Sequence, residues 1–77
     1  MPKLPMVTAK TIIQFLNQLG FGLSRQKGSH KFFKHPDGRT ATVPDHPGED
    51  LGRGLLKKIL NDIEISRDEF LDWLNKR

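Results

Sequence analysis

The 77-residue chain contains no cysteine, so disulfide bonds and thiolate metal ligands are excluded and a reducing compartment is compatible with it. It also lacks an apolar run near the ~20 residues that cross a bilayer. The first ten residues, MPKLPMVTAK, lack the apolar stretch of a signal peptide. We therefore expect a cytoplasmic protein, and this length predicts a single domain over residues 1–77.

Common enzyme motifs are missing as well. The sequence has no GxxxxGK[ST] phosphate loop, no GxSxG elbow and no HExxH helix, which argues against nucleotide-binding P-loop proteins, α/β-hydrolases and zinc proteases. Its three histidines, His30, His35 and His46, have spacings that match no recognised metal-ligand pattern. We expect neither a metal site nor another cofactor.

What the sequence does have is a localised positive charge. The net charge is +4, and the segment from Arg25 to Arg39 alone holds five basic residues against a single acidic one, so the rest of the chain is neutral overall. A basic segment of this kind predicts a surface that binds a polyanion such as RNA. The alternative is a solvated basic face that only aids solubility.

Periodicity and capping residues predict the helices. Thr8 is a good N-cap and Gly20 a good C-terminal stop for a helix over roughly 8–19. Leucines and isoleucines between Leu55 and Ile63 form a second apolar stripe, and the capping-box spacing of Ser66 and Glu69 predicts a short final helix. Trp73 falls off the apolar stripe of that last helix, which favours a partly exposed partner anchor.

Three strands are predicted between these helices. Residues 21–26 alternate as a half-buried strand, and His30–Lys34 and 40–43 form two more, joined by the turn at 35–38. We expect Lys34 to face Arg39 and His30 to face Val43, unless a bulge at Gly38 shifts the pairing by one residue. The order helix, three antiparallel strands, helix, short helix predicts an α+β domain.

The basic residues cluster on these strands. We predict that they bind RNA phosphates, making binding weaken with salt. Gly28 would allow close backbone approach, and the hydroxyl of Ser29 would bond a phosphate oxygen. The candidate RNA-binding residues are Arg25, Lys27, Gly28, Ser29, Lys31, Lys34 and Arg39.

His30 is the candidate catalytic residue. An imidazole side chain can both accept and donate a proton, and this one lies among cations, so it could deprotonate a ribose 2′-hydroxyl for attack on the adjacent phosphorus. The alternative is a histidine that closes the edge of the core near Val43. His46 is a possible accessory residue close to His30, or it stiffens its loop. We expect His35, in a turn before Pro36, to be solvated.

An ordered set of motifs resembles the HicA-type toxins. It consists of Gly28-Ser29-His30, the apolar strand at Phe32-Phe33, the turn at Pro36-Asp37-Gly38, the segment Val43-Pro44-Asp45-His46-Pro47, and the helix from Leu55 to Ile63. The resemblance covers about residues 8 to 74. It implies a fold like a double-stranded-RNA-binding domain, three antiparallel strands with helices on one face, and a metal-independent mRNA endoribonuclease.

The same resemblance implies a HicB-type antitoxin that covers the active site, and it places the catalytic histidine at His30. The general acid is unassigned, with His46 or a lysine as candidates. Two other functions stay open: a non-catalytic RNA-binding module that uses the sheet or the Arg53/Lys57/Lys58 helix face, and a small interaction protein that docks an acidic partner.

Overall fold

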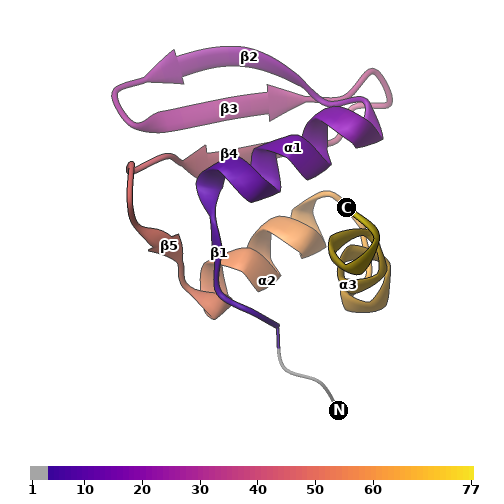
Figure 1. Cartoon of the computed structure of the whole chain (residues 1–77). Helices are drawn as coiled ribbons and strands as arrows, with labels where there is room; N and C mark the ends of the chain where they lie inside the picture. Colours follow the sequence, from indigo (N-terminus) through magenta and orange to yellow (C-terminus); the bar gives the residue numbers. More distant parts are fainter. Residues whose placement is uncertain (1–3) are drawn as a thin grey trace.

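The computed structural model describes residues 4–77 and confirms an α+β fold like that of double-stranded-RNA-binding domains (Figure 1). Two short strands that the sequence did not predict, β1 and β5, pair antiparallel beside the three-stranded sheet. In chain order the elements are β1 Val7–Thr8, α1 Ala9–Leu19, β2 Gly22–Lys27, β3 His30–Lys34, β4 Thr40–Pro44, β5 Asp50–Leu51, α2 Arg53–Asp62 and α3 Arg67–Lys76.

Helix α1 begins and ends where the sequence predicts. The hydroxyl of Thr8 accepts the backbone N–H of Thr11 at 3.3 Å, which satisfies one donor of the first turn. At the other end Gly20 adopts the left-handed conformation with φ of 100°, where a Cβ is disfavoured. The buried residues Ile12, Phe15 and Leu16 form the face that is turned to the core.

The β3–β4 register differs from the expected pairing by one residue. Lys34 pairs with Thr40, and His30 pairs with Pro44. The reason is the turn: the N–H of His35 donates to the carbonyl of Arg39 at 2.9 Å, and Gly38 has φ of 100°. Because His35 and Arg39 bond to each other across the loop, Arg39 belongs to the turn. The β3–β4 ladder therefore starts at Thr40, one residue after the expected position.

Strand β2 confirms the strand predicted at 21–26 to within one residue, but it is an exposed edge strand and not half-buried as predicted. All six residues of β2 are exposed, including Leu23, whose side chain keeps 53% of its accessible surface. The sheet order is β2-β3-β4, and the ladder shifts between Leu23 and Arg25. Because β2 is outermost and bulged, the helices do not cover it, and only Phe21 just before it is buried.

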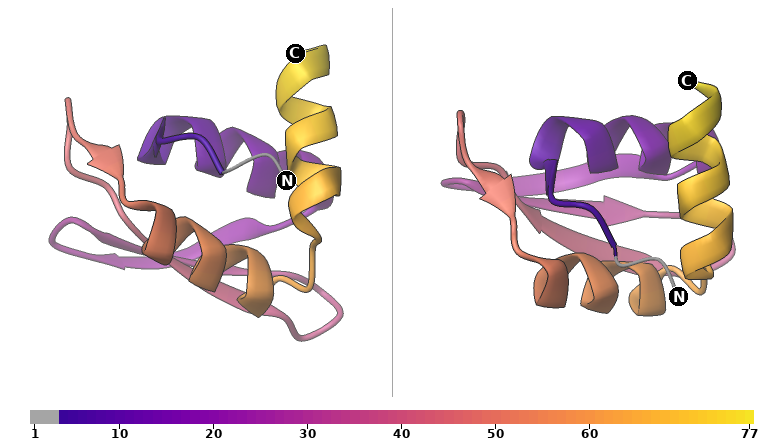
Figure 2. Two further views of the ribbon diagram at one scale, coloured as in Figure 1. Left: turned by 90° about the horizontal axis from the view of Figure 1, so that it is seen from below. Right: turned by 60° about the horizontal axis from the view of Figure 1, so that its bottom comes forward.

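The core lies between the helices and one face of the sheet. Figure 2 shows α1 and α2 on the same side of the sheet, with α3 running crosswise to α1. From the sheet the core takes Phe33, Ala41 and Val43, which alternate with exposed strand residues. No helix among residues 4–77 is long and apolar enough to cross a bilayer.

Helix α3 packs against α1 through aromatic rings. Phe70 is fully buried and meets the ring of Phe15 edge-on at 5.1 Å. Trp73 is half-buried, packs on Phe15 at 4.9 Å, and donates its indole N–H to the side chain of Gln18 at 2.8 Å. Trp73 is thus partly exposed, as predicted, but its ring and its donor serve the α1–α3 contact, which leaves little of it to anchor a partner.

Candidate nucleic-acid interface

The face of the sheet opposite to the helices carries the candidate catalytic residue. His30, Phe32 and Lys34 alternate on β3 with Lys31 and the buried Phe33, so they point away from the helices. Their partners on the neighbouring strands share this side of the sheet. The open face therefore comprises Gly22, Arg25 and Lys27 of β2, His30, Phe32 and Lys34 of β3, and Thr40, Thr42 and Pro44 of β4.

His30 and Lys27 are cross-strand partners at one end of this open face. Both side chains are exposed, so the imidazole is within reach of a bound ligand. Directly opposite residues of an antiparallel pair have Cβ atoms about 5 Å apart. The structure thus places Lys27 directly across the ladder from the candidate base.

Gly28 and Ser29 form the two-residue turn between these partners. Gly28 has φ of 59° and Ser29 does not have a positive φ, the pattern of a type II′ hairpin turn. A Cβ on Gly28 would meet nothing within 4 Å, so the backbone conformation alone explains this glycine. The carbonyl of Ser29 accepts the N–H of Asp45 at 2.7 Å, which ties the turn to the end of β4.

Arg25 and Phe32 are the next pair along the open face. The guanidinium carbon of Arg25 lies 4.8 Å from the centroid of the Phe32 ring, a cation–π geometry. Phe32 is half-buried although it points away from the helices, because the Arg25 side chain covers part of it. Lys34, the last residue of β3 on this face, is exposed.

Lys31 lies on the other side of the sheet from His30, although the sequence grouped the two. Its ammonium pairs with the carboxylate of Asp45 at 2.7 Å, and both side chains are about three-quarters buried. Next to this ion pair is a hollow lined by Lys10 and His46. His46 therefore lines a hollow on the helix side of the sheet with Lys31, whereas His30 lies on the open face.

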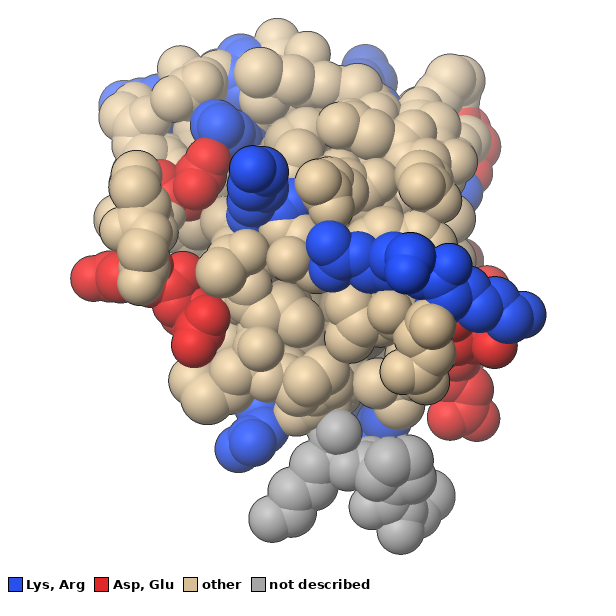
Figure 3. All heavy atoms as spheres, in the orientation of Figure 1, with Lys and Arg blue, Asp and Glu red and all other residues tan. Residues whose placement is uncertain are grey.

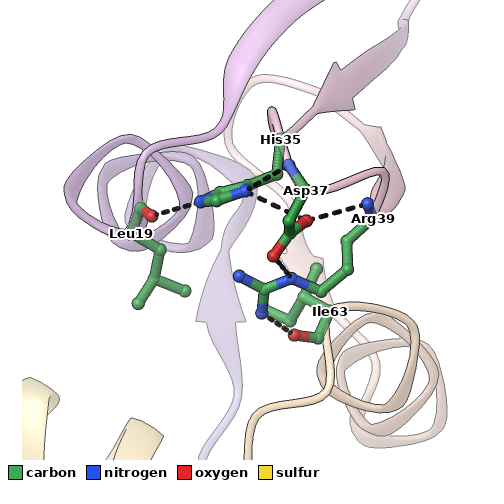
Figure 4. Close-up of polar contacts among 5 residues, drawn as sticks. All are labelled: Leu19, His35, Asp37, Arg39 and Ile63. Atoms are coloured by element: carbon green, nitrogen blue, oxygen red, sulfur yellow. Dashed lines mark hydrogen bonds and ion pairs between the residues drawn. The ribbon is translucent and has the colours of Figure 1, made fainter.

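Arg39 is engaged within the fold (Figure 4). Its backbone N–H and its Nε donate to the carboxylate of Asp37 at 3.0 and 2.7 Å, and its Nη1 donates to the carbonyl of Ile63 after α2. The guanidinium also lies over the ring of Phe21, 5.2 Å from its centroid. These contacts fasten the β3–β4 turn to α2 and favour a structural role over the phosphate contact predicted for Arg39.

His35 is structural rather than solvated, so that prediction was wrong. Its ring is half-buried and meets Phe21 edge-on at 5.0 Å. The ring also bonds the carbonyl of Leu19 at 3.0 Å (Figure 4). The side chain closes over Gly20, where an added Cβ would lie 3.1 Å from its Nε2. The partners of His35 are distant in sequence, so the local turn motif gave no signal of this role.

The carboxylate of Asp37 is stabilised by the same cluster. Its pKa is lowered, chiefly because it accepts the backbone N–H of Arg39 and further because the guanidinium of Arg39 and the ring of His35 lie close. Asp37 therefore offsets the charge of Arg39 at the turn. The one acidic residue of the basic segment is used to hold that arginine in place.

The two faces of the molecule differ in charge. Among the described residues, the strand positions of the open face include no aspartate or glutamate, while three of them carry a lysine or arginine. Figure 3 views the molecule from the side where α1 lies in front of the sheet, and there acidic and basic side chains are both present. The open face is therefore the better candidate for binding a polyanion.

The basic residues of α2 are partly neutralised. Arg53 donates to the carbonyl of Leu4 at 2.7 Å, and Lys58 pairs with Asp62 one turn later at 2.9 Å. Lys57 is exposed. This face of α2 consequently presents less unpaired positive charge than the open face of the sheet. Among residues 4–77 there is no group of three or more acidic, histidine or cysteine side chains placed to hold a metal ion.

Comparisons with known proteins agree with the order of motifs and the fold. A search of curated proteins found no match. A family model described as "HicA toxin of bacterial toxin-antitoxin" matches residues 9–65, from the start of α1 to just beyond α2. The matched segment contains the whole three-stranded sheet, with its open face and His30. Because the match spans well over half of its length, the chain belongs to the HicA toxin family.

Proposed function

We propose that this toxin is a metal-independent endoribonuclease that cleaves mRNA in the cytoplasm, with His30 as the general base. The observation that carries the proposal is the position of His30: an exposed imidazole paired across strands with Lys27, on a sheet face whose strand positions, among the described residues, hold no carboxylate. Such a face attracts the phosphate backbone and leaves the base accessible to it.

The proposed reaction is an internal transphosphorylation. His30 takes the proton of a ribose 2′-hydroxyl, the 2′-oxygen forms a bond to the adjacent phosphorus, and the bond from phosphorus to the 5′-oxygen breaks. The ammonium of Lys27 offsets the charge that builds on the phosphoryl oxygens and gives a proton to the leaving 5′-oxygen. The products are a 2′,3′-cyclic phosphate and a free 5′-hydroxyl.

Two placements support Lys27 over the other candidate acid. Lys27 lies opposite His30 in the ladder, whereas His46 lies in the hollow on the helix side with Lys31. One side chain that accepts a proton and one that donates a proton then face the same phosphate from neighbouring strands. General acid and base catalysis of this kind contributes roughly 10²–10⁴ in rate.

A HicB-type antitoxin is the proposed protein partner. Family membership implies a toxin–antitoxin pair. The open face is the surface that an antitoxin would have to cover to keep RNA from His30. An acidic strand or loop laid on Lys27 and Lys34 would offset their charges. Addition of the antitoxin should therefore stop both RNA binding and cleavage.

The decisive test compares variants on a single-stranded RNA substrate in EDTA. Wild type should yield 2′,3′-cyclic phosphate ends, and His30→Ala should lose cleavage by at least ~100-fold while binding RNA as before. His46→Ala is the matched histidine control and should retain cleavage. Undiminished cleavage by His30→Ala would overturn the proposal.

Duplex-RNA binding by the same variants, with Lys57→Ala added, decides the competing function, a non-catalytic module for double-stranded RNA. That function would give tight duplex binding without cleavage, indifferent to His30 and sensitive to Lys57. The ion pair at Lys58 and the bond from Arg53 to Leu4 make the α2 face the weaker candidate.

A further inference from the structure

We infer that the Phe32–Arg25 pair is a stacking platform for one base of single-stranded RNA, next to the scissile phosphate. This inference rests on the proposed function and adds a binding subsite that holds the substrate in place. The starting observation is an aromatic ring on the solvent side of a sheet, where strand residues around it are polar or charged. The core does not account for this ring, because it points away from the helices.

The geometry of the pair suits a nucleobase. A planar guanidinium lies over a planar ring at 4.8 Å, and RNA bases stack on both kinds of group. Arg25 also supplies a charge for the neighbouring phosphate. The flanking open-face residues Thr40 and Thr42 are exposed, so the space above the sheet is unobstructed on the β4 side.

The spacing places the platform one nucleotide from the chemistry. Phe32 is two residues after His30 on the same strand and face, which corresponds to about 7 Å along β3. This is close to the length of one extended nucleotide. Lys34 follows at the same interval. A strand that runs along β3 would therefore meet His30 and Lys27 at one phosphate and the platform at the adjacent base. Lys34, about 14 Å from His30 along β3, would meet the phosphate two nucleotides away.

The occupant is single-stranded RNA rather than a duplex or a protein. Stacking on a side chain requires a base that is not covered by neighbouring base pairs, so a duplex cannot use the platform. The open face lacks carboxylates among the described residues and presents lysines at both ends, which favours a polyanion.

The test measures binding separately from cleavage. The probe is a single-stranded oligonucleotide with every 2′-hydroxyl methylated, which cannot form the cyclic phosphate, together with a series in which an abasic nucleotide replaces one base at a time. Phe32→Leu, which keeps apolar bulk on the sheet, should bind the intact probe about 10-fold more weakly than wild type. Phe32→Tyr should restore binding, Arg25→Lys should give an intermediate loss, and Thr40→Ser is the control on the same face.

The critical result is whether the loss of affinity caused by an abasic nucleotide depends on the Phe32 ring. One abasic position should weaken binding to wild type but leave the Phe32→Leu variant unaffected. Equal losses in both proteins at every position, or full binding by Phe32→Leu, would overturn the platform. Thermal unfolding verifies that each variant is folded. If Phe32→Leu does not fold, the abasic series is compared between wild type and Arg25→Lys, with Phe32→Tyr as the variant that keeps an aromatic ring. An all-ribose version of the probe, which can be cleaved, separates the two proposals. If this RNA is cleaved but no abasic position distinguishes wild type from Phe32→Leu, only the stacking platform is overturned. If an abasic position does distinguish the two proteins but the RNA is not cleaved, only the proposed nuclease activity is overturned.

Discussion

The Nε2 atom of His35 lies 3.0 Å from the carbonyl oxygen of Leu19, the last residue of α1. The other ring nitrogen, Nδ1, accepts the backbone N–H of Asp37 at 3.1 Å, so in the neutral ring the hydrogen is on Nε2, which donates to Leu19. This carbonyl is one of those that the helix leaves without an internal partner. His35 therefore joins the end of α1 to the β3–β4 turn.

This relationship predicts that His35 contributes to the stability of the fold, whereas His30 contributes to activity and little to stability. His35→Ala removes the bond to Leu19 and the ring contact with Phe21, so the free energy of unfolding should fall by about 2 kcal/mol. His30→Ala, at an exposed position, should change it by less than about 0.5 kcal/mol while abolishing cleavage. Urea unfolding of both variants measures this contrast, and equal destabilisation would contradict it.

Asp37 predicts a specific dependence of stability on pH. Because its pKa is lower in the folded protein than the ordinary value of about 3.9, its contribution is fully present above that value and is lost as the pH falls through the folded pKa. Wild type should thus be more stable than Asp37→Asn at pH 7, and the difference should shrink below about pH 4. Unfolding of the two proteins from pH 7 to pH 2 is the measurement. A difference that stays constant over this range would be inconsistent with the cause given.

Glu64 offers a site for stabilisation. It is the sole non-glycine residue with a positive φ among residues 4–77, at 58°, and it follows α2 in the position where glycine is preferred. Glu64→Gly should therefore raise the free energy of unfolding by about 0.5–1 kcal/mol. Glu64→Ala keeps the Cβ and serves as the control, with little or no gain. If the alanine variant gains as much as the glycine variant, the carboxylate and not the backbone conformation is the cause.

Substitution of the lysines should weaken RNA binding on the open face of the sheet but not on the helix side. Lys27→Gln and Lys34→Gln each remove a phosphate contact that we propose, so each should weaken binding and reduce the slope of log K against log salt by about 0.7 for single strands. Lys31→Gln breaks the ion pair with Asp45 and should lower stability by up to about 1 kcal/mol, with the salt slope unchanged. Titrations at several salt concentrations give the slopes. A reduced slope for Lys31→Gln would place RNA on the helix side.

Several features could be predicted from the sequence because their causes are local. Thr8, Gly20 and Ser66 lie where helices begin or end, since a cap needs only residues within one turn. The apolar stripes gave the buried faces of α1 and α2 for the same reason. The motif that contains His30 also determined the family, which the match over residues 9–65 confirmed.

The tertiary structure alone decided which of the charged residues lie together. Lys31 and His30 are neighbours in sequence, but the helices cover one face of the sheet, so one of them pairs with Asp45 and the other faces solvent. Arg39 and His35 find partners 24 and 16 residues away, at the end of α2 and the end of α1. Such contacts arise from the packing of distant elements, and a pattern that is read along the chain cannot report them.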